Sequence, residues 1–445
     1  MQAEATESRR PITRRGFLNR GALAAGALGL PSFIPARALG RDGTVAPSNR
    51  INMAAIGVGG RGTGDLRAML SMPDVRFVAV CDVDKGRREA AKRMVDETNG
   101  SKDCAAYIDM RQLFAERPDV EAVLIATGDR WHALASVLAM RAGKDVYCEK
   151  PACLTVAEGL QVAKTARRHG RIYQMGSQRL SESPHIGAIE MASTGRLGTI
   201  HTVYADCRWR GGFKRPWLPA EPEPAKTELD WDLWLGPSAW RPYNSAYVHK
   251  NDWYNHEDMA TDIAQWGAHT VAQALAGLDL GKITSIDFEY AGPGLTMMTR
   301  LSNGVKLVLY RHAGNVWDPC QYWSGACGER FEGDQGWAAA ADGYTKPEVS
   351  TPSLLNDYKR ILAEYAARTR RPTNHVRDFL DCIRTRRDTV AHPELMVLSM
   401  GICLAADICE KLGRNLKFDL VKLEFVGDPE ANRLRNRAMR SPYTF

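Results

Sequence analysis

Three glycines and an acidic residue have the clearest chemical use in this sequence. Gly57, Gly59 and Gly62 form a G-x-G-x-x-G motif that follows an apolar segment, residues 51–56, and precedes a helix-like segment. Here the glycines permit a tight turn and close approach of the backbone to a pyrophosphate, and the helix N-terminus favours phosphates. Asp82 stands 20 residues beyond Gly62, where its carboxylate can accept hydrogen bonds from ribose hydroxyls. The pattern predicts a dinucleotide site that favours NAD.

Three basic residues keep the choice of cofactor open. Lys85, Arg87 and Arg88 lie just beyond Asp82. Cationic side chains at this position can accommodate the 2′-phosphate that distinguishes NADP from NAD. NAD is therefore the expected cofactor, and NADP remains the alternative.

The elements that position these residues are strands separated by helical stretches. Apolar segments at 51–56, 75–81, 120–126 and 145–148 alternate with helix-like segments. This alternation predicts an α/β fold with a doubly wound parallel sheet, in which ligands bind beyond the carboxyl ends of the strands. The residues predicted to bind the cofactor around that crevice are Gly57, Gly59, Gly60, Arg61, Gly62, Asp82, Thr127, His132, Glu149 and Lys150.

The motif Glu149-Lys150-Pro151, with the glycine motif and the segment Ala126–His132, resembles the Gfo/Idh/MocA oxidoreductases. Four further segments resemble exported members of that family: Gly176–Gln178, Trp231–Pro237, Trp266–His269 and Gly427–Arg433. The resemblance covers residues 50–445. It implies NAD(P)-dependent oxidation or reduction of a sugar, cyclitol or related polyol. It also implies a Rossmann domain and a second α/β domain, whose open, mostly antiparallel sheet covers the nicotinamide and builds homo-oligomer contacts.

Lys150 is a candidate catalytic residue. A lysine at the carboxyl end of a strand beside a nicotinamide can stabilise a developing alkoxide, or can shuttle a proton if burial lowers its pKa. The resemblance implies that Lys150 lies beside the nicotinamide and the reacting hydroxyl. The alternative is a solvated lysine paired with Glu149.

A second polar group falls on one face of a helix predicted over residues 258–278. Its members are Asp262, Gln265, Trp266, His269 and Gln273, a stripe suited to a cavity wall. The resemblance implies that His269 is catalytic and contacts the reacting hydroxyls. It also puts the family's acidic residue at Gln265, whose amide cannot titrate.

Asp262 and Gln265 are candidates for substrate contact, and so are His256 and Tyr254. Asp262 can replace the missing acid, or it can cap the helix. His256 and Tyr254 lie at the end of a tryptophan-rich loop, residues 210–256, of the kind that builds binding clefts. The tryptophans suit stacking on sugar rings and equally suit local packing.

The first forty residues predict export. Arg14-Arg15-Gly16-Phe17-Leu18 resembles a twin-arginine signal, and it precedes a short apolar run, 21–30, and the small-residue pattern Ala36-Arg37-Ala38. The run is too short to span a bilayer, which needs about 20 residues. A periplasmic or otherwise exported protein without a membrane span after cleavage is expected. Because this pathway carries folded proteins, it suits an enzyme that loads its cofactor before crossing.

Charge and cysteine usage exclude other classes of protein. Six arginines and two glutamates stand in residues 1–38, which leaves +3 of the net charge of +7 for the rest, too little to indicate a nucleic-acid partner. None of the ten cysteines forms a C-x-x-C pair, and no metal site is predicted. Buried free thiols are expected, with Cys320–Cys327 and Cys403–Cys409 as alternative disulfides.

The predicted organisation has five parts. They are a signal peptide (1–38), a linker (39–49), an NAD(P)-binding Rossmann domain (50–172), a substrate and oligomerisation α/β domain (173–412) and a polar C-terminal tail (413–445). Three functions fit them. The first is an exported oxidoreductase acting on a sugar, glycoside or polyol; the others are an NAD-dependent glycosidase that recycles its cofactor and a non-catalytic carbohydrate or nucleotide sensor.

Overall fold

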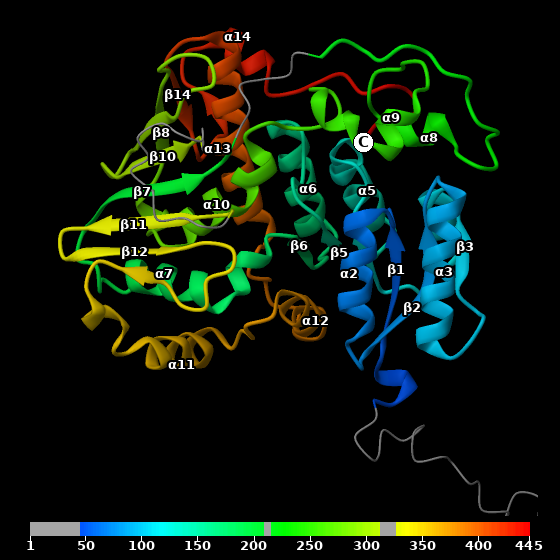
Figure 1. Cartoon of the computed structure of the whole chain (residues 1–445), viewed down its shortest axis with the longest axis horizontal. Coiled ribbons are helices and arrows are strands. Elements are labelled where there is room, and N and C mark those ends of the chain that lie inside the picture. Colours follow the sequence, from blue (N-terminus) through cyan, green and yellow to red (C-terminus); the bar gives the residue numbers. More distant parts are fainter. Residues whose placement is uncertain (1–44, 209–214, 312–325) are drawn as a thin grey trace, which may run out of the picture. The chain divides into compact units, whose positions relative to one another are not determined.

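The computed structural model describes residues 45–208, 215–311 and 326–445 (Figure 1). The chain divides into two units, residues 1–50 and 51–445, and both sheets belong to the second. The predicted signal peptide lies outside the described residues. Within the described residues, no helix is both long and apolar enough to cross a membrane.

The first sheet has six strands in the order β3-β2-β1-β4-β5-β6, and all of its pairings are parallel. Its strands are β1 (Ile51–Ile56), β2 (Val75–Cys81), β3 (Ala105–Tyr107), β4 (Ala122–Ile125), β5 (Asp145–Cys148) and β6 (Tyr173–Met175). Its helices are α2 (Gly60–Leu70), α3 (Lys85–Asn99), α4 (Met110–Glu116), α5 (Asp129–Arg141) and α6 (Val156–Arg168). Every residue of β4 and β5 is buried, as expected for parallel strands covered on both faces. The predicted doubly wound sheet is confirmed.

The second sheet has nine strands in the order β13-β12-β11-β7-β10-β9-β8-β14-β15. Strands β7 and β10 pair in parallel, and the other neighbours pair antiparallel. The strands are β7 (Ile200–Asp206), β8 (Ser285–Glu289), β9 (Met297–Leu301), β10 (Lys306–Tyr310), β11 (Glu329–Gly333), β12 (Gly336–Ala340), β13 (Glu348–Val349), β14 (Leu416–Asp419) and β15 (Glu424–Phe425). The prediction of a mostly antiparallel second sheet is confirmed, and residues expected in a polar tail supply β14 and β15.

Helices join the two sheets. They are α7 (Ser183–Ser193), α10 (Ala264–Ala276), α11 (Tyr358–Thr369), α12 (His375–Thr385) and α13 (Pro393–Leu412). Helix α10 packs against β7 on one side and α13 on the other, and α13 also packs on α6 of the first domain. One apolar core therefore runs from Ile125 and Val146 to Val203 and Leu307, and the two domains share it.

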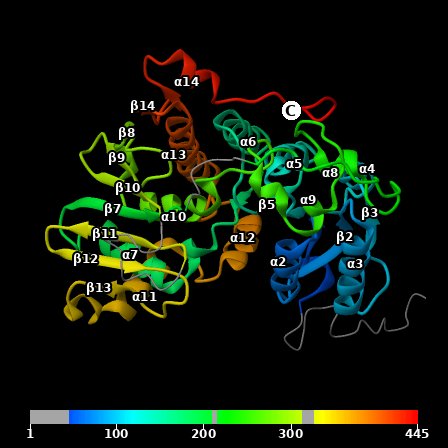
Figure 2. The same cartoon turned by 45° about the horizontal axis from the view of Figure 1, so that its top comes forward.

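The segment 228–255, here called the aromatic strap, folds back onto the first domain. It contains α8 (Trp231–Leu235), α9 (Ser245–His249) and a 3-10 turn, Asp252–Asn255. Trp231 stacks on Trp234 with ring centroids 4.7 Å apart, inside an apolar cluster of its own. Figures 1 and 2 show α8 and α9 beside α5. The buried strap tryptophans therefore serve as packing anchors.

The nine cysteines that the structure describes are all buried and free, so the pairing of Cys403 with Cys409 is wrong. Cys320 lies outside the described residues. Small uncharged thiols are packed like other apolar side chains in such cores.

Candidate active site

The glycine motif makes the turn between β1 and α2. Gly57 has a φ of +78°, and a Cβ there would lie 2.6 Å from the backbone nitrogen of Thr127. A Cβ on Gly62 would collide with the carbonyl oxygen of Gly57. Both positions therefore require glycine, and the turn leaves Gly59 and Gly60 in the wall of a cavity at the carboxyl ends of the strands.

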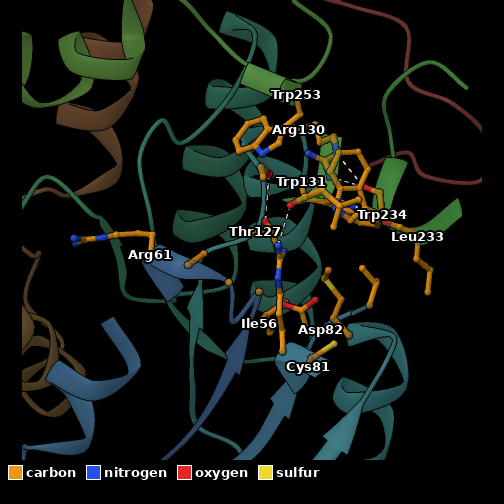
Figure 3. Close-up of a pocket in the computed structure, with 18 of the residues that line it drawn as sticks. Ile56, Arg61, Cys81, Asp82, Thr127, Arg130, Trp131, Leu233, Trp234 and Trp253 are labelled. Carbon is orange, nitrogen blue, oxygen red and sulfur yellow. Dashed lines mark hydrogen bonds between the residues drawn. The ribbon is translucent and has the colours of Figure 1, made fainter. Parts of the chain in front are cut away.

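Asp82 holds this turn from the end of β2. Its carboxylate accepts hydrogen bonds from the backbone N–H groups of Val58, at 2.8 Å, and Asp84, at 2.9 Å. The side chain lines the cavity, and burial raises its pKa. Figure 3 shows Asp82 beside Cys81 at the base of the cavity, below Thr127. Asp82 thus lies where the sequence predicts a ribose contact.

The basic residues after Asp82 are held by the protein. Lys85 Nζ lies 2.8 Å from a Glu228 carboxylate oxygen, Arg87 donates to the Val248 carbonyl at 2.9 Å, and Arg88 donates to the Asp82 carbonyl at 2.6 Å. Two of these contacts fasten the aromatic strap to α3. These partners favour NAD over NADP.

The aromatic strap covers the cavity. The residues of the strap that line it include Leu233, Trp234, Val248 and Trp253. The indole nitrogen of Trp131, on α5, donates to the Leu233 carbonyl at 2.9 Å. The strap is therefore fixed to the domain whose cavity it covers.

Arg130 lies in the cavity wall between two strap tryptophans. Its guanidinium carbon is 3.8 Å from the Trp234 ring centroid and 5.7 Å from that of Trp253 (Figure 3). Nε donates to the Trp234 carbonyl at 2.9 Å, but buried Nη1 has no hydrogen-bond partner among the described residues. A buried cation with an unused donor, beside a glycine cradle, fits a dinucleotide phosphate. The residues present therefore fit NAD.

Lys150 extends from the end of β5 toward α10. Its Nζ donates to the Gln265 carbonyl at 3.0 Å and lies 5.7 Å from the Trp266 ring centroid. Glu149 instead accepts hydrogen bonds from Arg61, at 3.1 Å, and Gln178, at 2.5 Å. Both residues are described by the structure and they do not pair with each other, so the alternative of a lysine paired with Glu149 is wrong.

His269 faces the same region from α10. It is 3% exposed, and its Nδ1 lies 3.4 Å from the Ser177 hydroxyl. Burial holds the pKa of His269 well below its ordinary value, and the charges of Lys150 and Arg179 lower it further. His269 is therefore neutral near pH 7, as a proton acceptor must be.

Two predicted cofactor residues, His132 and Arg61, bind groups of the protein, and Arg61 also lines the cavity. His132 is buried, with Nδ1 2.7 Å from the Pro151 carbonyl and Nε2 3.0 Å from the Thr127 carbonyl, so it ties two loops of the site together. The guanidinium of Arg61 pairs with Asp65 at 2.8 Å and with Glu149. Figure 3 shows it pointing away from the other labelled side chains.

The structure separates the substrate candidates. Tyr254 lines the cavity and stacks on Trp253 with ring centroids 3.7 Å apart. His256 lies inside the packed loop, with Nε2 3.3 Å from an Asp252 carboxylate oxygen. Asp262 precedes α10, whose N-cap is Ile263, and lies in the wall of a second cavity. It therefore neither caps the helix nor shares the His269 face.

The predicted helix over 258–278 is wrong at its start. Residues 256–260 form a turn in which the His256 carbonyl accepts from the amides of Met259 and Ala260, and the Asp258 carboxylate binds Arg241. This tertiary ion pair holds the chain out of the helix, so α10 begins six residues later, at Ala264.

Asp129 is a residue of the site that sequence reasoning did not single out. It opens α5, it is 3% exposed, and it accepts a hydrogen bond from the side-chain amide of Gln265. In a sequence, an acidic residue in the first turn of a helix is explained by its favourable interaction with the helix dipole, so the pattern indicates no other role. No cluster of three or more metal-ligating side chains occurs in the described ranges.

Two family models match the chain. "Oxidoreductase family, NAD-binding Rossmann fold" matches residues 51–177, and "Oxidoreductase family, C-terminal alpha/beta domain" matches residues 327–445. Both describe the Gfo/Idh/MocA family, and together they cover more than half of the 445 residues.

Curated relatives match over shorter stretches. A glycosyl hydrolase family 109 protein of Saccharopolyspora erythraea is 29% identical over 259 residues, 52% of this chain and 54% of that protein. An inositol 2-dehydrogenase of Salmonella typhimurium is 32% identical over 147 residues, 32% of this chain and 41% of that protein. The chain thus spans about half or less of the length of these relatives.

A solved structure shares the fold. The WlbA dehydrogenase from Bordetella pertussis, in complex with NADH and UDP-GlcNAcA, aligns with a TM-score of 0.58 and 15% identity over 82% of this chain and 97% of that one. The fold and the two family models show that the chain belongs to the Gfo/Idh/MocA oxidoreductases, with an NAD-binding Rossmann domain at residues 51–177.

Proposed function

We propose that this protein uses NAD to oxidise or reduce a hydroxyl or keto group of a sugar, glycoside or polyol. The observation that carries the proposal is that Lys150, from the Rossmann domain, donates to the Gln265 carbonyl of α10, the helix that also carries His269, and that the charge of Lys150 lowers the pKa of His269. In alcohol oxidation a neutral imidazole can accept the hydroxyl proton, and a fixed cation can stabilise the negative charge that develops on the oxygen. An inositol 2-dehydrogenase among the relatives supports this substrate class.

The residues divide the work. The glycine turn, Asp82 and Arg130 hold the dinucleotide, which when bound accepts or returns a hydride. His269 takes the proton of the reacting hydroxyl at its imidazole nitrogen. Lys150 stabilises the negative charge that develops on the oxygen. The strap, through Trp234, forms part of the wall of the cavity.

A redox-neutral glycosidase is the second candidate. Two observations favour it: the family 109 glycosyl hydrolases among the relatives, and the strap fastened over the cavity by Lys85, Arg87 and Trp131. An enclosed cofactor that is oxidised and reduced within one turnover needs no external supply of NAD.

Cofactor content and product analysis test these proposals. Purified protein is denatured, the supernatant is assayed for NAD(H) and NADP(H), and intact protein is incubated with sugars and glycosides. An oxidoreductase raises absorbance at 340 nm, the NADH band, whereas a glycosidase releases the aglycone without net NADH. Protein that carries no nicotinamide, binds NAD weakly and turns over neither substrate would be a sensor, and both proposals would be wrong.

We further propose export through the twin-arginine pathway and assembly into a homo-oligomer. The support for export is the Arg14-Arg15 motif with its apolar run, and the support for assembly is the resemblance. Export predicts that Arg14→Lys/Arg15→Lys protein stays in the cytoplasm, which cell fractionation measures. Light scattering measures assembly.

A further inference from the structure

Asp129 and Gln265 connect the two domains at the active site. The Asp129 carboxylate, in the first turn of α5, accepts the side-chain N–H of Gln265 and the backbone N–H of Thr261. Two donors from the second domain thus converge on one buried carboxyl group of the Rossmann domain.

Gln265 extends this contact to Lys150. The backbone carbonyl oxygen of Gln265 accepts a hydrogen bond from Lys150 Nζ at 3.0 Å. The side-chain amide of Gln265 donates to Asp129. The first turn of α10 is therefore held between the Asp129 carboxylate and the Lys150 ammonium group, both of the other domain. Hydrogen bonds to charged groups are stronger than neutral ones, so these two contacts fix both ends.

We propose that Asp129 is a positioning residue: its ionised carboxylate fixes Gln265 and thereby holds Lys150 in place, and its protonation releases that constraint. The inference rests on the proposed function, because it assigns the control of Lys150 in that reaction. It needs no proton to pass between Asp129 and the substrate.

The surroundings of Asp129 support an ionisation in the working range. Burial raises the pKa of Asp129 to about 7, against the charges of Lys150 and Arg130 and the Gln265 hydrogen bond, which lower it. The negative charge of Asp129 is also felt by Tyr254, on the strap, and by Cys148, at the end of β5. Turnover should therefore rise with pH through about 7 as Asp129 ionises.

Exchanging the two side chains tests the role directly. Asp129→Asn removes the carboxylate and should lower kcat at pH 8 by about 10- to 100-fold, since a charged hydrogen bond contributes roughly 1.5–3 kcal/mol. It should also remove the rise near neutral pH. The double variant Asp129→Asn/Gln265→Glu restores a carboxylate–amide hydrogen bond with its direction reversed, and should recover most of kcat. Wild-type kcat in the single variant, or no recovery in the exchange, overturns the proposal.

A stability measurement separates this inference from the proposed function. A raised folded-state pKa means that folded wild-type protein binds a proton that the unfolded chain has lost, so its stability falls as pH rises from about 4 to about 7. The Tm of Asp129→Asn minus the Tm of wild type should therefore increase as pH rises over this range. The same difference for Asp287→Asn, a variant at an exposed residue, should show no such trend. If the trend is present and no substrate turns over, the proposed function is wrong and Asp129 still titrates. If the trend is absent, the inference is wrong.

Discussion

His269 is 3% exposed, and its burial among positive charges from Lys150 and Arg179 keeps its imidazole neutral. Lys150 itself is bound by a carbonyl oxygen, which leaves its positive charge uncompensated by Glu149. That Lys150 and His269 are candidate catalytic residues could be predicted from the sequence. The neutral state of the His269 imidazole could not, because desolvation and neighbouring charges depend on which distant segments are packed against it.

Replacing Lys150 tests its proposed role. Lys150→Met should lower turnover by about 10²- to 10⁴-fold, since a positioned charged or proton-transferring group contributes that much. The nicotinamide content of purified protein should not change, because the dinucleotide is held by other residues. Lys164→Met, an exposed lysine on α6, is the matched control. Loss of bound cofactor together with activity would contradict the assignment.

A second buried histidine, His375, should make the stability of the protein depend on pH. Burial lowers the pKa of His375 to about 4, and its Nε2 lies 2.9 Å from the Met175 carbonyl. The unfolded chain takes up a proton near pH 6.5 that the folded chain does not, so stability is lost as pH falls below this value. At pH 5 the cost is about 2 kcal/mol. Denaturant titrations at pH 5 and 7 should show that His375→Gln removes this component; an unchanged pH dependence would contradict the prediction.

The turn between β1 and α2 was predictable because its requirements are local. A strand, a glycine with positive φ and a helix N-terminus lie within a dozen residues, and each has its own sequence signal. The start of α10 was not predictable, because the Asp258–Arg241 ion pair joins residues from separate parts of the loop. Element boundaries that depend on tertiary contacts leave no periodic signal.

Gly57→Ala tests the turn. The positive φ and the contact with Thr127 should cost about 1–3 kcal/mol of stability and abolish NAD binding. Gly64→Ala is the matched control, because its Cβ meets nothing within 4 Å in the middle of α2. The control should be stabilised by roughly 0.5–1 kcal/mol. Thermal unfolding and NAD titration measure both variants, and equal NAD affinity in the two would refute this account of the turn.

The C-terminal segment holds the strap onto the first domain. Arg440 donates to the carbonyl oxygens of Gly236, at 3.1 Å, and Ser238, at 3.2 Å. The ring of Tyr443 packs edge-on against Trp131, with centroids 5.4 Å apart. Residues of the C-terminal segment therefore meet the strap and Trp131 beside the NAD cavity, a contact that the local pattern of a polar segment does not predict.

This arrangement predicts how tightly the cofactor is retained. Arg440→Ala should raise the rate of nicotinamide dissociation by about 5- to 30-fold, because the lost hydrogen bonds are worth roughly 1–2 kcal/mol. Fluorescence of bound NADH during dilution measures that rate. Exposed Arg360→Ala should leave it unchanged. Unaltered dissociation from Arg440→Ala protein would mean that the strap does not retain the cofactor.

By itself, the sequence determined the parallel sheet, its glycine turn, the class of cofactor and the choice of Lys150 and His269 as candidate catalytic residues. These follow from periodicity and short motifs, whose physical causes act within one strand or one turn. Only the tertiary structure decided that Asp129 meets Gln265, that Asp262 lies elsewhere and that the strap covers the cavity. Such contacts depend on the packing of segments more than a hundred residues apart, and hydrogen bonds and burial take effect only when packing brings the groups together.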